Sequence, residues 1–197
     1  MAKEVHKGIP AVSPRNRKAW RQWLAKNHTG LKNVWLVFYN KKSGKARFGY
    51  DEAVEEALCF GWIDGTANPR DEESSYRLFA QRNPKSNWSK LNRERAERLI
   101  NEGLMAEAGL KMIELAKKSG TWEALIDVQN SVIPPDLQKL LDKNKTALKN
   151  FSAFPPSSKR IILEWILNAK RPETREKRLK ETVELAAQNI KANHYRQ

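Results

Sequence analysis

Three places along the chain hold polar side chains that could bind a ligand. Asp64 ends an apolar segment, Arg77 and Arg82 lie on or after the next predicted strand, and a polar helix start follows from Ser86. A helix N-terminus offers free amides, and an arginine offers a two-pronged donor for a carboxylate or phosphate. Together these groups would make a pocket for an anionic ligand, with candidate residues Trp62, Asp64, Arg77, Arg82, Ser86, Trp88, Ser89 and Asn92.

A structural role explains the same residues. Asp64 stands among apolar and glycine residues, and an isolated buried carboxylate is too costly to keep ionised, so it must reach water or be paired. In this interpretation Asp64 caps backbone amides or pairs with Arg82. Ser86 and Ser89 then cap the following helix, and Trp88 packs in the core. The sequence leaves both interpretations open.

Catalysis and metal binding find little support in the residue types. Cys59 lies in an apolar run near a predicted helix end, whereas a cysteine nucleophile needs a histidine or a helix start to lower its pKa. Serine catalysis needs a histidine base, and His6, His28 and His194 lie far apart. One cysteine also excludes a disulfide scaffold. We expect no metal, no cofactor and no catalysis; an enzyme that uses the pocket for a small ligand or phosphate is the alternative.

The positive charge is concentrated at the two ends of the chain. The net charge is +14, and residues 1–50 carry 12 basic side chains against one acidic side chain. Such asymmetry suits an acidic protein surface, a lipid headgroup or nucleic acid, but it also serves plain solubility. No segment resembles a known nucleic-acid reading helix, so nucleic acid is the least favoured partner. The candidate basic surface consists of Arg15, Lys18, Arg21, Lys170, Arg171 and Arg175.

The start of the chain and its hydropathy bear on location. The first seven residues lack the apolar core of a signal peptide. No apolar run approaches the roughly 20 residues that a membrane-spanning helix needs. We therefore expect a cytoplasmic protein without a transmembrane segment.

Hydrophobic periodicity predicts the elements that must position the candidate site. A helix starts at Ser13-Pro14 and places Trp20, Trp23 and Leu24 on one face. The apolar run 34–39 predicts a central strand that is covered on both faces. The other predicted elements are a helix over 51–58, a hairpin of strands 62–67 and 76–81, a helix from Ser86 to about Asn101 and a helix over 105–119.

The two ends of the chain differ in their predicted structure. Residues 1–12 are expected to be loosely ordered. In the C-terminal part, Pro134-Pro135 starts a short helix, and Ser157 or Ser158 caps the next helix. A break at 171–175 precedes the last helix. We predict an α+β protein with a small antiparallel sheet packed by helices, followed by an all-helical C-terminal region. The expected domains are 13–130 and 131–192.

Five segments, taken in order, resemble a known family. They read Ala-Leu-Cys-Phe-Gly-Trp-Ile-Asp-Gly (57–65), Pro-Lys-Ser-Asn-Trp-Ser-Lys-Leu-Asn (84–92), Gly-Leu-Met (103–105), Ala-Lys-Lys-Ser-Gly-Thr-Trp (116–122) and Ala-Lys-Arg-Pro-Glu-Thr-Arg (169–175). Together they resemble the YdeI/OmpD-associated family, also called bacteriocin-protection proteins. The resemblance extends from about residue 20 to residue 190.

The resemblance implies a bacterial stress or antimicrobial-peptide protection factor that acts by ligand or protein binding. No set of catalytic residues comes with it. The family usually has Thr-Pro-Arg-Arg or Thr-Pro-Arg-Lys before the second segment, whereas residues 80–83 read Ala-Gln-Arg-Asn here. If that stretch binds an anion, the one arginine that remains, Arg82, implies weaker binding.

Overall fold

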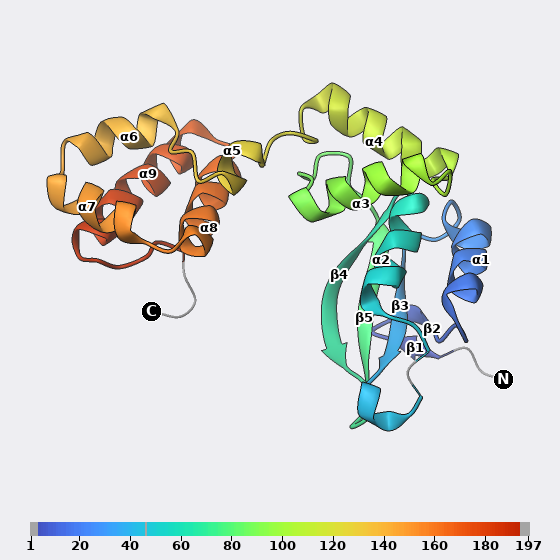
Figure 1. Cartoon of the computed structure of the whole chain (residues 1–197). Helices are drawn as coiled ribbons and strands as arrows, with labels where there is room; N and C mark the ends of the chain where they lie inside the picture. The colour runs from blue at the N-terminus through green and yellow to red at the C-terminus, as the bar shows by residue number, and fades with distance from the viewer. Residues whose placement is uncertain (1–3, 46, 194–197) are drawn as a thin grey trace. The chain divides into compact units, whose positions relative to one another are not determined.

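The computed structural model describes residues 4–45 and 47–193 (Figure 1). The chain forms two compact units, the first ending at Trp122 and the second beginning at Glu123. Each unit has a hydrophobic core of its own, so each is described by itself.

The first unit is built on a five-stranded sheet with the order β1-β2-β3-β5-β4. Its centre is β3 (Asn33–Tyr39), which pairs antiparallel with β5 (Ser74–Gln81) and parallel with β2 (Ile9–Val12). The edges are β4 (Trp62–Pro69), in a hairpin with β5, and the short β1 (Val5–His6). Four consecutive residues of β3 are buried, which confirms a strand covered on both faces.

The α+β class is confirmed, but the sheet is mixed and larger than expected. Residues 5–12, which the sequence predicts to be loosely ordered, supply β1 and β2. These strands are short and include Pro10, so their pattern gives a weak strand signal. Tertiary contacts hold them instead: the Trp35 indole donates to the carbonyl oxygen of His6 at 2.9 Å, and Ala11 pairs with Trp35.

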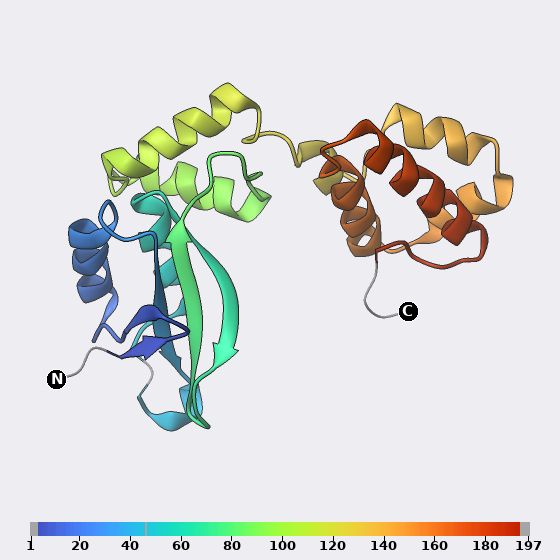
Figure 2. The same cartoon turned by 180° about the vertical axis from the view of Figure 1, so that it is seen from behind.

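The helices of this unit lie over one face of the sheet and beyond one end of it (Figures 1 and 2). The helices are α1 (Arg17–Asn27), α2 (Tyr50–Cys59), α3 (Lys90–Asn101) and α4 (Glu107–Ser119), and a 3-10 turn, η1 (Lys41–Ser43), follows β3. Trp20 and Leu24 of α1 are fully buried, and Trp20 packs edge-on against Phe79 of β5. The predicted inward face of α1 is therefore confirmed.

The first helix begins later than the sequence predicts. The expected start at Ser13-Pro14 is wrong, because α1 begins at Arg17 and its N-cap is Asn16. The Asn16 side-chain oxygen accepts a hydrogen bond from the amide of Ala19 at 2.8 Å. Asparagine caps a helix as well as serine does, and the residue whose side chain reaches the free amide decides the boundary.

The second unit is entirely helical, as expected. It contains α5 (Ile126–Gln129), α6 (Pro135–Asp142), α7 (Lys145–Ala153), α8 (Pro156–Leu167) and α9 (Pro172–Ala187). The sequence pattern does not predict α7, whose Phe151 is fully buried. A serine cap is expected for α8, whereas the N-cap is Pro155 and Ser158 is buried inside the helix. Among the described residues, no helix has the length and apolar character that crossing a membrane requires.

Two glycines allow the end of α2 to touch α4. A Cβ atom at Gly109 would lie 2.5 Å from the carbonyl oxygen of Cys59 and 2.7 Å from that of Leu58. Gly61, just after α2, has a φ of +72°, and a Cβ there would lie 2.8 Å from the Met112 side chain. Because real atoms cannot approach so closely, only glycine fits either position. This contact fixes the point at which β4 begins.

We predict that Gly109→Ala destabilises the first unit by at least about 2 kcal/mol, because the new methyl group meets backbone carbonyls that cannot move aside. At an unobstructed helix position, replacing glycine by alanine would stabilise the protein by about 0.5–1 kcal/mol. The sign of the change in unfolding free energy therefore shows whether the close contact exists. Chemical denaturation followed by tryptophan fluorescence measures the effect. Gly30→Ala, with no atom within 4 Å, is the matched control. A neutral Gly109→Ala would contradict the close approach.

Candidate functional site

The structure places most of the predicted site residues in two neighbouring clusters of the first unit. The Asp64 cluster consists of Tyr50, Asp64, Arg77, Asn92 and Arg95. The Arg82 cluster consists of Arg82, Asn87, Trp88, Ser89 and Trp122. Trp62 belongs to neither, because it is fully buried in the core and its indole donates to the carbonyl oxygen of His28 at 3.1 Å.

Asp64 lies half-buried on β4 and is held by a tyrosine. The hydroxyl of Tyr50, the first residue of α2, donates to the Asp64 carboxylate at 2.5 Å. The guanidinium of Arg77 lies over the Tyr50 ring, 5.1 Å from its centroid, and donates to the Gly65 carbonyl at 3.0 Å. Asp64 therefore has a neutral hydrogen-bond partner and a cation nearby, rather than the backbone amides expected from the sequence.

Tyr50 is a functional candidate that sequence reasoning missed. Partial burial and the Asp64 carboxylate raise the pKa of Tyr50 to about 12, although Arg77 and Arg95 act in the opposite direction. The hydroxyl is therefore neutral at pH 7 and acts as a hydrogen-bond donor, not as a base. No sequence pattern links Tyr50 to Asp64, because the packing of α2 on β4 brings them together.

Asn92 joins the Asp64 cluster through Arg95. Arg95 donates to the side-chain oxygen of Asn92 at 3.1 Å and forms an ion pair with Asp51 in the first turn of α2. The Asn92 oxygen is therefore engaged within the protein. Arg95 was not a predicted site residue, although its spacing from Asn92 on α3 is that of neighbouring residues on one helix face.

The Arg82 side chain is buried without an acidic contact. Only 6% of Arg82 is exposed, and its guanidinium lies 3.9 Å from the centroid of the Trp88 ring. One terminal nitrogen, Nη2, donates to the Asn87 carbonyl at 2.7 Å. The buried Nε makes no hydrogen bond to any part of the chain that the structure describes. Such an orphaned buried donor is rare in folded proteins.

Burial dominates the electrostatics of Arg82. It lowers the pKa of Arg82 to about 10, and the charge of Asp64 only partly opposes this. The expected Asp64–Arg82 ion pair does not form, although the structure describes both residues. A guanidinium stays charged at pH 7. The lowered pKa therefore corresponds to a free-energy cost of burying this positive charge, on the order of 3 kcal/mol.

The start of α3 differs from the expected one. The cap is Ser89, whose hydroxyl accepts from the amide of Asn92 at 3.3 Å, and the helix begins at Lys90. Ser86 is not the cap, because its hydroxyl donates to the carbonyl of Asn83 at 2.7 Å in the preceding turn. Packing of the Trp88 ring against Trp122 completes the Arg82 cluster, with ring centroids 4.9 Å apart.

The basic surface is reduced by internal ion pairs. Arg21 pairs with the buried Glu56 at 2.7 Å, and Arg175 pairs with Asp136 at 2.7 Å. Both arginines are therefore occupied in holding helices together. The basic candidates that remain exposed are Arg15, Lys18, Lys170 and Arg171.

Nucleophilic and metal-ligating groups are scattered. Burial raises the pKa of the Cys59 thiol more than the nearby Arg21 lowers it, so the residue is a thiol rather than a thiolate at pH 7. Over residues 4–45 and 47–193, no three side chains of His, Cys, Asp or Glu gather as a metal site would require. His194 lies outside the described residues.

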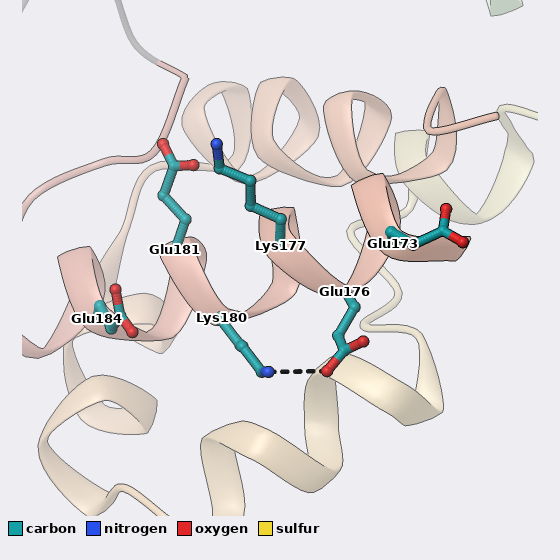
Figure 3. Close-up of a pocket in the computed structure, with 6 residues that line it drawn as sticks. All are labelled: Glu173, Glu176, Lys177, Lys180, Glu181 and Glu184. Carbon is teal, nitrogen blue, oxygen red and sulfur yellow. Dashed lines mark ion pairs between the residues drawn. The ribbon is translucent and has the colours of Figure 1, made fainter. Parts of the chain in front are cut away.

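A hollow in the surface follows one face of α9 (Figure 3). It is lined by Glu173, Glu176, Lys177, Lys180, Glu181 and Glu184, all from the same helix. Lys180 and Glu176 pair at 2.7 Å, one helical turn apart. Charges of both signs at this spacing are typical of a solvated helix face, and none of the predicted site residues lies here.

Two family models match different parts of the chain. Residues 12–112 match the model described as "Domain of unknown function (DUF8412)", and residues 130–189 match the model described as "Bacteriocin-protection, YdeI or OmpD-Associated". The comparisons with curated proteins and with solved structures gave no match. The YdeI/OmpD-associated resemblance is thus confirmed, but over a shorter range than expected: segments 57–65, 84–92 and 103–105 lie in the other matched region, 116–122 lies in neither, and only 169–175 lies within residues 130–189.

We predict that Tyr50→Phe lowers the free energy of unfolding at pH 7 by about 1 kcal/mol or less, since the lost hydrogen bond is partly screened by solvent. The folded pKa of Tyr50 lies above the ordinary value, so this stabilisation is complete below pH 10 and disappears as the pH rises toward 12. Urea unfolding at pH 8 and pH 11 measures it. The difference between wild type and variant should shrink at pH 11.

The matched control is Tyr39→Phe, because the Tyr39 ring lies against Arg47 and its hydroxyl has no hydrogen bond within the described residues. This control should show no comparable change of the difference with pH. A Tyr50→Phe difference that stays constant from pH 8 to pH 11 would contradict the assigned Tyr50–Asp64 bond.

Proposed function

Because the chain belongs to the DUF8412 family and carries a bacteriocin-protection, YdeI or OmpD-associated domain in its helical part, we propose that it protects bacterial cells against bacteriocins or antimicrobial peptides. It acts in the cytoplasm as a stress factor, by binding a ligand or a protein rather than by catalysis. The α+β part, residues 13–130, contains the ligand site, and the helical part, residues 131–192, is the protective domain.

The observation that carries this proposal is the state of Arg82. Its guanidinium is almost completely buried, and among the described residues it has no acidic partner of the kind that buried charges usually have. An anionic ligand or an acidic surface would supply that partner. The candidate ligand contacts are Asp64, Arg77, Arg82, Ser86, Trp88, Ser89 and Asn92, whereas Trp62 is buried in the core.

The chemistry of the site supports binding over catalysis. The raised pKa of Tyr50 removes it as a base near pH 7, and the raised pKa of Cys59 removes it as a thiolate nucleophile. The second candidate is an enzyme that binds a small ligand or phosphate near Asp64 and Arg82. Nucleic-acid binding is supported least, since Arg21 and Arg175 are occupied by ion pairs.

Survival assays test the proposal. A sensitive bacterial strain that expresses the protein should survive a panel of colicins and a cationic antimicrobial peptide better than the same strain with an empty vector. Arg82→Gln should remove most of the gain, because it removes the cation of the ligand site. Cys59→Ala should keep it, because the thiol takes no part.

The outcomes separate the candidates, provided that each variant is shown to be folded by its thermal melt. Loss of protection in a folded Cys59→Ala variant would point to covalent chemistry and contradict the binding mechanism. Full protection by Arg82→Gln would remove Arg82 from the function. No gain of survival with any of the toxins would refute the protective role itself.

A further inference from the structure

We propose that Arg82 and the N-terminus of α3 together bind an oxyanion, a carboxylate or phosphate group, and that Asp64 is the internal negative charge that opposes it. This inference rests on the proposed function, because it names the ligand class of the same site. It assigns opposite roles to two residues that sequence reasoning placed side by side as ligand contacts.

The start of α3 supplies the first half of the site. This helix has 12 residues, enough for a developed dipole, and its first turn contains no acidic side chain. Its cap, Ser89, satisfies one amide, that of Asn92, at 3.3 Å. The first two amides of the helix, those of Lys90 and Leu91, are donors that an intrahelical bond cannot satisfy.

Arg82 supplies the second half independently. Its hydrogen bond to the Asn87 carbonyl and its stacking on Trp88 fix the guanidinium against the two residues that directly precede the cap. Its Nε is buried and makes no hydrogen bond to the described chain. A guanidinium and free helix amides are the donors that recognise carboxylates and phosphates. The basis of the inference is the position of the Arg82 guanidinium against Asn87 and Trp88, the residues that precede the cap of α3.

Asp64 cannot be the partner that Arg82 lacks. One of its oxygens accepts the Tyr50 hydroxyl at 2.5 Å, and no ion pair connects the carboxylate to Arg82 within the described residues. It nevertheless acts on Arg82 through its charge. A bound oxyanion would be repelled by that charge and attracted by the guanidinium, so the two side chains affect its affinity in opposite directions.

The turn before α3 lies next to the Arg82 guanidinium, which donates to the Asn87 carbonyl. Nε is closed off from solvent, so an oxyanion reaches it only when the chain around it moves. Within residues 83–87, the amide of Lys85 donates to the Asn83 side chain at 2.9 Å, and the amide of Ser86 donates to the Asn83 carbonyl at 3.0 Å. Lys85 is exposed there and adds positive charge at the entrance.

Titration calorimetry of the full chain tests the site, with inorganic phosphate and acetate as probes at constant ionic strength. We expect saturable binding of at least one probe. Arg82→Gln should weaken it about ten- to hundredfold, since a hydrogen-bonded charge is lost. Asp64→Asn keeps an acceptor for Tyr50 but removes the negative charge, and it should tighten binding about three- to tenfold.

Two further variants control for folding and for general charge. Arg82→Lys keeps the positive charge but lacks the paired N–H donors of the guanidinium, so it should bind the probes more weakly than wild type. Because this replacement is conservative, weaker binding then reports loss of the site rather than loss of the fold. Lys139→Gln removes one exposed positive charge from α6 in the second unit and should leave affinity unchanged. Preference for phosphate or for acetate identifies the source of the oxyanion, and either preference supports the site.

Three results would overturn the inference: no binding of either probe, equal binding by wild type and Arg82→Gln, or weaker binding by Asp64→Asn. Such results would leave the survival assay to judge the protective role on its own. Conversely, intact phosphate or acetate binding without any protection of cells would refute the proposed function and leave the oxyanion site standing.

Discussion

The contact between the end of α2 and α4 is the constraint on which the first unit depends. Gly61 and Gly109 allow backbone to approach backbone there, and the Cys59 carbonyl accepts the amide of Ala106 at 3.1 Å. The chain then turns directly into β4, which carries Asp64. The Gly61 carbonyl also accepts the amide of Arg82 at 2.9 Å. One glycine-dependent contact therefore sets the positions of both charged residues of the candidate site.

Arg82 differs from Glu56, the other nearly buried charged residue among those that the structure describes, in how its charge is stabilised. Glu56 is also nearly buried, but Arg17 and Arg21 pair with it at 2.6 and 2.7 Å. The cost of removing its charge from water is thus offset by two charge-assisted hydrogen bonds. Arg82 has one carbonyl and one aromatic ring instead. A charge kept in this state is a better candidate for function than for stability.

Periodicity was sufficient to predict the elements with strong internal patterns. The strand at 34–39, the helix at 51–58 and the hairpin that starts at Trp62 are all present. The features that were missed depend on contacts between distant segments. Residues 5–12 become strands because His6 and Ala11 meet β3, which no local pattern reveals.

In the candidate site, too, local features were predictable from the sequence and contacts between distant segments were not. The sequence indicates its residue types and its helix start, but not which serine is the cap or that Tyr50 holds Asp64. A cap depends on which side chain reaches a free amide, and a cross-element hydrogen bond depends on packing. The absence of an acidic contact at Arg82 is likewise a property of the fold.

The most direct test of the central claim is the ¹⁵N resonance of the Arg82 Nε–H group during a phosphate or acetate titration. Its signal can be assigned by its absence from the spectrum of Arg82→Lys. We predict that this signal moves and saturates at the concentrations at which calorimetry detects binding, because the orphaned donor gains an acceptor. An unchanged Arg82 Nε–H signal while the protein is saturated with the oxyanion would contradict the account.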